Sequence, residues 1–154
     1  MNAMELAVAR ARETMDRNLG GPFGAAVADA KGNIIAVSSN LVLGSHDPTA
    51  HAEINAIREA GSLLGTHDLS GCTLYTSCYP CPMCLGAILW ANISTVYYGC
   101  RPEDAAAIGF RDDFMYDFIR AGCKDAKVLL LEEQARDSCL ELFKEYSVKE
   151  KRLY

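Results

Sequence analysis

Apolar side chains near the start of the chain recur every three or four residues, which is the spacing of an amphipathic helix. They run from Met4 to Met15 with charged residues on the opposite side, so the pattern predicts a first helix that ends near Leu19. Two short runs rich in small and β-branched residues follow at 24–29 and 33–39. The short, glycine-containing connection between these runs predicts a β-hairpin.

The rest of the chain alternates between helical and extended patterns. Thr49 is a candidate N-cap for a helix over about 50–64. The further predicted elements are a strand at 72–77, a helix at 81–91, a strand at 95–98, a helix at 103–120 interrupted near Gly109, a strand at 127–131 and a closing helix over about 135–146. Helices between strands imply a sheet covered on both faces, so we predict a three-layer α/β/α fold around a five-stranded mixed sheet.

Length and composition are typical of one domain with a substantial core. The chain has 154 residues, of which 50% are hydrophobic and 23% charged, so we predict a single domain over 1–154. Charges interrupt the first twenty residues too often for a signal peptide. The uncharged stretch 70–100 is broken by prolines and turn residues, so a membrane span is not expected. We therefore expect a cytoplasmic protein.

The charge balance bears on the choice of partner. The net charge is −5 and the isoelectric point is near 5.2. Such a chain has no basic field to release counterions from a nucleic-acid backbone and no surplus of cations for anionic lipid. We predict a small-molecule substrate and neither a nucleic-acid nor a membrane partner.

Two short motifs carry the candidate chemistry. His51-Ala52-Glu53 is followed downstream by Pro80-Cys81-Pro82-Met83-Cys84, and seven cysteines in all without a secretory signal indicate thiols kept for metal binding or catalysis. An H-x-E motif followed by P-C-x-x-C is the signature of zinc nucleobase and nucleoside deaminases. The motifs therefore predict one zinc ion per subunit, held by His51, Cys81 and Cys84.

The spacing of these residues suits a catalytic metal. Two thiolates three residues apart at a helix start can reach one ion, and the exposed N–H groups there stabilise their charge. Three ligands leave the fourth tetrahedral position to water, whose pKa falls to ~7 on zinc. Glu53 lies two residues from His51 and does not share its helix face, so we predict that it moves protons and is not a ligand.

Three other readings of the cysteines remain open at this stage. Cys78, Cys81 and Cys84 begin an iron–sulfur motif, but that motif expects Cys-Pro where this chain has Ile88-Leu89. A thioredoxin-like redox pair would leave the upstream H-x-E motif without a purpose. In the third reading Cys78 is a fourth ligand, which would close the site into a structural zinc.

Longer motifs extend the match over nearly the whole chain. They are Gly-Gly-Pro-Phe-Gly-Ala at 20–25, Asp-Pro-Thr-Ala-His-Ala-Glu at 47–53, Pro-Cys-Pro-Met-Cys-Leu-Gly-Ala-Ile at 80–88 and Gly-Phe-Arg-Asp at 109–112. With these motifs the chain resembles the bacterial guanine deaminases of the cytidine deaminase superfamily. The resemblance implies a cytidine-deaminase-like fold and the hydrolysis of guanine to xanthine and ammonia.

The resemblance also implies roles for residues around the metal. Phe23 would stack on the purine, and Asn40 and the backbone N–H of Ala52 would hold its polar edge. Asp112 would assist Glu53 in proton transfer.

Further expectations concern the end of the chain and its assembly. The resemblance places Trp90 among the substrate-binding residues and implies a homodimer in which the tail at about 147–154 crosses to the partner. Tyr154 would then cap the partner's pocket. Two positions depart from the family pattern, because Tyr79 replaces a typical glutamate and Arg111 replaces an acidic residue.

Because of these departures, other functions stay open. The substrate could be guanosine, another nucleoside, a pyrimidine or a triazine-like ring. A tRNA adenosine deaminase shares both short motifs but needs a basic surface. The remaining alternative is a non-enzymatic zinc or redox protein.

Overall fold

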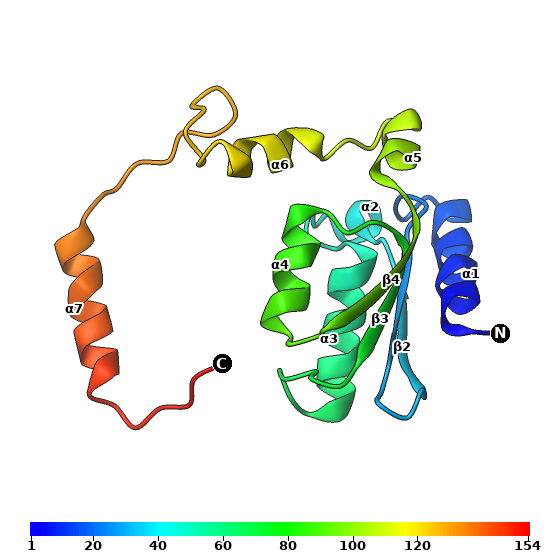
Figure 1. The fold of residues 1–154 in the computed structure, drawn as a ribbon, viewed down its shortest axis with the longest axis horizontal. Coiled ribbons are helices and arrows are strands. Elements are labelled where there is room, and N and C mark those ends of the chain that lie inside the picture. Colours follow the sequence, from blue (N-terminus) through cyan, green and yellow to red (C-terminus); the bar gives the residue numbers. More distant parts are fainter. The chain divides into compact units, whose positions relative to one another are not determined.

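A four-stranded mixed sheet organises the first part of the chain (Figure 1). The strands are β1 (Gly24–Ala28), β2 (Ile34–Ser39), β3 (Thr73–Cys78) and β4 (Thr95–Cys100), in the order β2-β1-β3-β4. β1 runs antiparallel to both of its neighbours, whereas β3 and β4 are parallel. The hairpin and the strands predicted at 72–77 and 95–98 are therefore confirmed.

Helices cover both faces of this sheet, which confirms the three-layer prediction. α1 (Ala3–Asp16) packs on one face and α3 (Ala52–Leu64) on the other, with α4 (Pro82–Trp90) beside α3 (Figure 1). Neighbouring residues of β1 point to opposite layers: Ala26 joins the cluster under α1, while Ala25 and Val27 join the larger cluster under α3. All five residues of β1 are buried, as expected for a strand between two helical layers.

A close approach explains the glycine that begins β1. A Cβ atom at Gly24 would lie 1.9 Å from the carbonyl oxygen of Ala7 in α1. Only a residue without a side chain allows the helix and the strand to come this near. Glycine at this position therefore sets the distance between α1 and the sheet.

The computed structural model describes residues 1–154 as two units, Met1–Asp112 and Asp113–Tyr154. The first unit also contains α2 (Val42–Ser45), which the sequence analysis did not predict, and α5 (Pro102–Ala107). The second contains α6 (Asp113–Arg120) and α7 (Arg136–Ser147). The break near Gly109 and the closing helix are thus confirmed.

The fifth predicted strand, 127–131, is absent from the sheet. A strand needs a neighbour to satisfy its N–H and C=O groups, and these residues pair with none. Their apolar side chains are exposed instead. None of the helices combines the length and apolar character that a membrane span needs.

The strand directions bring several loops to one edge of the sheet. Because β1 is antiparallel to β2 and β3, the carboxyl ends of β2, β3 and β4 meet the amino end of β1 at this edge. The edge is where Phe23, Asn40 and the Cys78–Cys81 segment lie in the chain. In open α/β sheets this is the edge that carries ligand sites.

Candidate metal centre and active site

The predicted metal ligands lie at the N-termini of two neighbouring helices. His51 is the N-cap of α3 and Cys81 the N-cap of α4, and neither side chain makes a capping hydrogen bond. The predicted cap Thr49 is wrong, because its hydroxyl donates to Asp47 Oδ1 at 2.7 Å and the helix begins only after His51, which has the extended backbone of an N-cap. Both N-cap side chains are therefore left to face each other.

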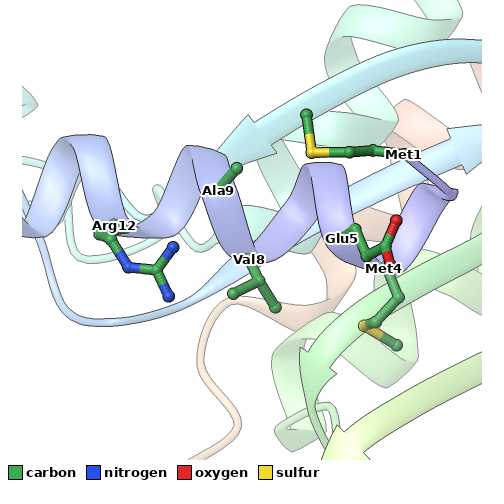
Figure 2. Close-up of a pocket in the computed structure, with 6 residues that line it drawn as sticks. All are labelled: Met1, Met4, Glu5, Val8, Ala9 and Arg12. Atoms are coloured by element: carbon green, nitrogen blue, oxygen red, sulfur yellow. The ribbon is translucent and has the colours of Figure 1, made fainter.

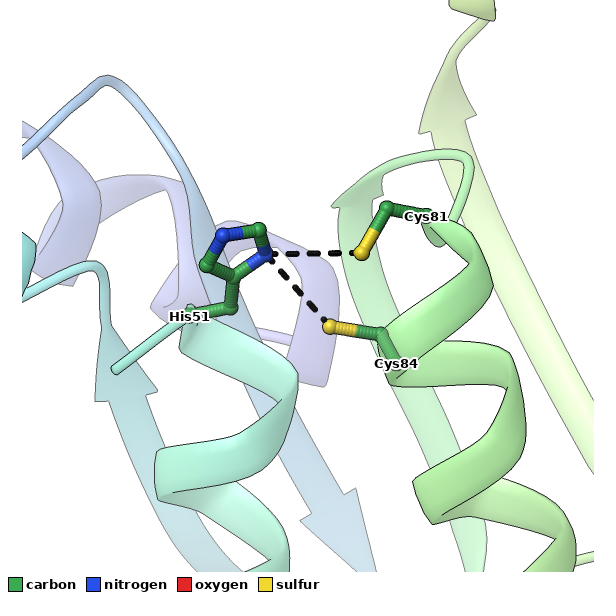
Figure 3. A group of neighbouring side chains, drawn as sticks. All are labelled: His51, Cys81 and Cys84. Carbon is green, nitrogen blue, oxygen red and sulfur yellow. Dashed lines mark hydrogen bonds between the residues drawn. The ribbon is translucent and has the colours of Figure 1, made fainter. Parts of the chain in front are cut away.

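The three ligand atoms converge on one point (Figure 3). Nδ1 of His51 lies 3.6 Å from Sγ of Cys81 and 3.6 Å from Sγ of Cys84. All three atoms lie within 4.8 Å of one another. One imidazole nitrogen and two thiolates fit tetrahedral zinc, with a fourth position left for a reactant. The arrangement is that of a catalytic metal site.

Cys78 does not belong to this group. Its Sγ lies 3.9 Å from the carbonyl oxygen of Arg101, to which it donates. Burial raises the pKa of the Cys78 thiol to about 11, so it stays protonated at neutral pH. The structure therefore shows no fourth sulfur ligand that would close the site.

The thiols of the two cysteine ligands have pKa values displaced in opposite directions. A hydrogen bond from Cys84 lowers the pKa of Cys81 to about 4, and the same bond raises the pKa of Cys84. Cys81 is thus the thiolate, and its hydrogen bond with His51 raises the pKa of the imidazole. A thiolate beside two helix N-termini is prepared for a cation.

Glu53 lies next to the metal ligands but outside their group. Its side chain is only 6% exposed, and burial raises the pKa of its carboxyl. Oε1 accepts a hydrogen bond from Thr76 at 3.1 Å, and Oε2 lies 3.5 Å from Sγ of Cys84. A carboxyl whose pKa is raised toward neutrality suits proton transfer.

Asn40 is buried at the same edge of the sheet, directly after β2. Its Oδ1 accepts hydrogen bonds from the backbone N–H of Gly21 at 3.3 Å and of Val42 at 3.1 Å. Both contacts occupy the oxygen, so the amide has its Nδ2 hydrogens to offer to a ligand. Asn40 therefore presents a donor.

Asn55 fixes the backbone on both sides of this region. Its Nδ2 donates to the carbonyl oxygen of Ser39 at 2.9 Å and to that of Ala50 at 3.2 Å. One residue thus ties the end of β2 to the segment that leads into His51.

Two aromatic rings lie at the entrance to β1. Phe23 makes an edge-to-face contact with Phe110, with ring centroids 5.0 Å apart and an interplanar angle of 88°. Asp112 follows two residues later and acts on the site electrostatically. Its charge is one of the smaller causes, after the Cys81 hydrogen bond, that raise the pKa of His51.

The other predicted substrate-binding residues lie in different settings. Ala52 is fully buried at the first position of α3, where a backbone N–H has no partner within the helix. Trp90 ends α4 with 70% of its surface exposed. Tyr154 ends the second unit and is also exposed.

A shallow groove along the outer side of α1 has a different character (Figure 2). It is lined by Met1, Met4, Glu5, Val8, Ala9 and Arg12. The Glu5 carboxylate caps its own helix by accepting from the backbone N–H of Asn2 at 2.8 Å. The groove brings together no metal ligands, so the chemistry belongs to the opposite face of the sheet.

Sequence reasoning missed Thr76, Asn55 and Phe110 as neighbours of the site. Thr76 occupies an inward position in the alternating pattern of β3, which marks it as buried but not as a partner of Glu53. Phe110 lies in the Gly-Phe-Arg-Asp motif, but that motif does not indicate the contact with Phe23. No local motif distinguishes Asn55.

Comparison with known proteins agrees with this site. The model of the cytidine and deoxycytidylate deaminase zinc-binding region matches residues 1–100. The guanine deaminase of Bacillus subtilis is 51% identical over 116 residues, which cover 75% of this chain and 74% of that relative. The tRNA-specific adenosine deaminase of Haemophilus influenzae is 40% identical over 97 residues, which cover 63% of this chain and 56% of that relative.

Solved structures show the same similarity. The X-ray structure of the Bacillus subtilis guanine deaminase matches with a TM-score of 0.90 and 40% sequence identity, and the match covers 100% of this chain and 99% of that one. The matched region of the family model contains the whole H-x-E and P-C-x-x-C constellation, with His51, Cys81 and Cys84 as the zinc site. The chain therefore belongs to the cytidine and deoxycytidylate deaminase zinc-binding family.

Proposed function

We propose that the protein is an aminohydrolase that converts guanine to xanthine and ammonia. The observation that carries this proposal is the three-ligand zinc site with a buried carboxylate, Glu53, beside it. The extent of the similarity to a guanine deaminase, over three quarters of both chains in sequence, selects guanine among aminated bases.

His51, Cys81 and Cys84 would hold the zinc ion, which would supply a water with a pKa lowered to ~7 as a nucleophile at neutral pH. Glu53 accepts a proton from the attacking water and returns it to the base. Its burial raises its pKa, so the carboxyl holds the transferred proton readily. Asp112 assists proton movement at another part of the base.

The polar edge of the base is recognised by donors. Asn40 offers its Nδ2 hydrogens because its oxygen is held by Gly21 and Val42, and Ala52 offers its backbone N–H at the start of α3. Guanine presents a carbonyl oxygen and ring nitrogens as acceptors to such donors. Phe23 stacks on the ring, and burial of an aromatic face adds binding energy.

A panel of substrates tests this proposal. The zinc-loaded protein is incubated with guanine, guanosine, cytosine, cytidine and adenine, and released ammonia is measured for each. We expect the highest kcat/KM with guanine. A higher value with guanosine would identify a nucleoside deaminase, and no ammonia from any compound would contradict the proposal.

A separate experiment tests tRNA as a substrate, because one tRNA-specific adenosine deaminase is 40% identical to this chain. The net charge of −5 argues against a nucleic-acid substrate, since backbone phosphates are bound by basic surfaces. We expect no inosine in tRNA incubated with the protein and no salt-sensitive gel shift.

We also propose that the protein is a homodimer in which residues at about 147–154 cover the partner's pocket and Tyr154 caps it. The second unit supports this, because α7 exposes large apolar side chains: Leu142, Phe143 and Tyr146. An apolar helix face that is open in one chain calls for a partner. In this proposal residues 1–154 form one domain that is completed by the exchange.

Mixed dimers provide a direct test of the exchange. One variant carries Glu53→Gln and the other lacks Leu153 and Tyr154, so each alone has only incomplete sites. On co-refolding, about half of the dimers are mixed, and one site in each combines an intact Glu53 with an intact tail. Recovery of activity supports the exchange, whereas no recovery contradicts it.

A further inference from the structure

A single buried hydroxyl connects the proton-transfer carboxylate to the segment that carries the cysteine ligands. Thr76 lies in β3 and is 1% exposed. Its Oγ1 is 3.1 Å from Oε1 of Glu53 and 3.0 Å from the carbonyl oxygen of Cys78. A hydroxyl has one proton to donate, so at any moment it donates to one of these two oxygens.

Packing alone does not account for a threonine at this position. The inward residues of β3 alternate with outward ones, and Leu74 in the same row is fully buried within the apolar core. Valine has nearly the shape of threonine and would fill the same space without a polar group to satisfy. The hydroxyl therefore matters for its contacts.

The contacts of Glu53 divide between its two oxygens. Oε1 is held by Thr76, while Oε2 lies 3.5 Å from Sγ of Cys84, on the side of the zinc ligands. With Oε1 anchored, rotation of the carboxylate about its last torsion is restricted. That torsion is otherwise broad for a glutamate side chain.

We propose that Thr76 is a positioning residue for the deamination: its hydroxyl anchors Oε1 of Glu53 and so keeps Oε2 directed toward the zinc site. The Cys78 carbonyl is the other acceptor within reach of this hydroxyl, and the backbone runs from Cys78 through Tyr79 and Pro80 into Cys81. One side chain thus sets the carboxylate relative to the ligands. The inference rests on the proposed role of Glu53 in proton transfer.

Two substitutions separate positioning from packing. Thr76→Val keeps the volume and removes the hydroxyl, whereas Thr76→Ser keeps the hydroxyl and removes a methyl group. We expect Thr76→Val to lower kcat by about 10- to 100-fold, the effect of losing a hydrogen bond to a charged group, with KM little changed. Thr76→Ser should keep kcat within about threefold of wild type.

A purely structural role predicts the opposite order. The serine variant would then be the more damaged one, because it leaves a cavity in the core. Thr14→Val is the matched control, since the Thr14 hydroxyl is also buried but bonds only to carbonyls of its own helix, Arg10 and Ala11. It should leave kcat unchanged.

Two readouts do not depend on turnover. Both Thr76 variants should bind one zinc per subunit, and a crystal structure of Thr76→Val should show the Glu53 carboxylate rotated or spread over several orientations. An unchanged carboxylate together with unchanged kcat would overturn the inference. If wild type released no ammonia from any base, the proposed function would fail, and the crystal structure would still decide whether Thr76 orients Glu53.

Discussion

Replacing Glu53 with glutamine tests the central chemical assignment. The substitution keeps the size of the side chain, and the amide oxygen can still accept from Thr76 at the place of Oε1. What is lost is the ability to take up and return a proton. Because Glu53 is outside the ligand group, the variant should bind zinc as the wild type does.

The expected loss of activity follows from the burial of this group. Glu53 is only 6% exposed, so bulk water does not readily replace it as the proton carrier. Removal of a general acid/base lowers kcat by about 10²- to 10⁴-fold. We expect at least this effect with guanine as the substrate.

The same substitution, which lowers activity, should raise the stability of the zinc-free protein. Burial raises the pKa of Glu53 in the folded state above its pKa in the unfolded chain. The stability associated with the protonated carboxyl is therefore present below the unfolded-state pKa and is lost as the pH rises through the folded-state pKa. At neutral pH the glutamine variant should therefore be the more stable, and this difference should vanish near pH 4.

The assays are steady-state kinetics, metal analysis and urea denaturation at several pH values. Glu59→Gln is the matched control, because Glu59 lies on the same helix and its carboxylate accepts from Ser38 at an exposed site. The control should keep its activity and show no such pH-dependent gain in stability. Near wild-type turnover of Glu53→Gln would remove Glu53 from the mechanism.

Three further substitutions test other parts of the structure. Cys84→Ser should lower bound zinc well below one per subunit, and stoichiometric zinc by metal analysis would contradict the ligand assignment. Asn40→Asp replaces the donor by an acceptor and should lower kcat/KM for guanine by about tenfold or more, while one oxygen still accepts from Gly21 and Val42. The same kcat/KM for Asn40→Asp and wild type would show that Asn40 does not bind the base. Gly24→Ala should destabilise the fold by about 1–3 kcal/mol in urea denaturation because of the clash with the backbone of α1, and an unchanged midpoint would refute so close a contact.

Short-range patterns in the sequence were enough to identify the metal site. His51, Cys81 and Cys84 occupy two motifs whose spacing is chemically specific, and the structure brings their ligand atoms within 4.8 Å. Cys81 and Cys84 are three residues apart at a helix start, so local geometry alone places both thiols on one ion. The periodicity of α1 and α7 was likewise readable, because a helix is formed by contacts between residues near in sequence.

Tertiary structure decided the features that depend on pairing between distant segments. The 127–131 segment has the composition of a strand, but strand formation requires a neighbour, and the four-stranded sheet does not include it. The direction of the Asn40 amide follows from N–H groups at Gly21 and Val42, which no propensity scale describes.

The surroundings of the proton-transfer group were also beyond the sequence. Thr76 and Glu53 are separated by 23 residues, and their contact exists because the register of β3 brings one inward position beneath the first turn of α3. The sequence by itself determined which residues bind the metal, since those ligands belong to specific local motifs. The fold decided how the carboxylate and the amide beside them are oriented, since orientation depends on which buried groups meet across the sheet.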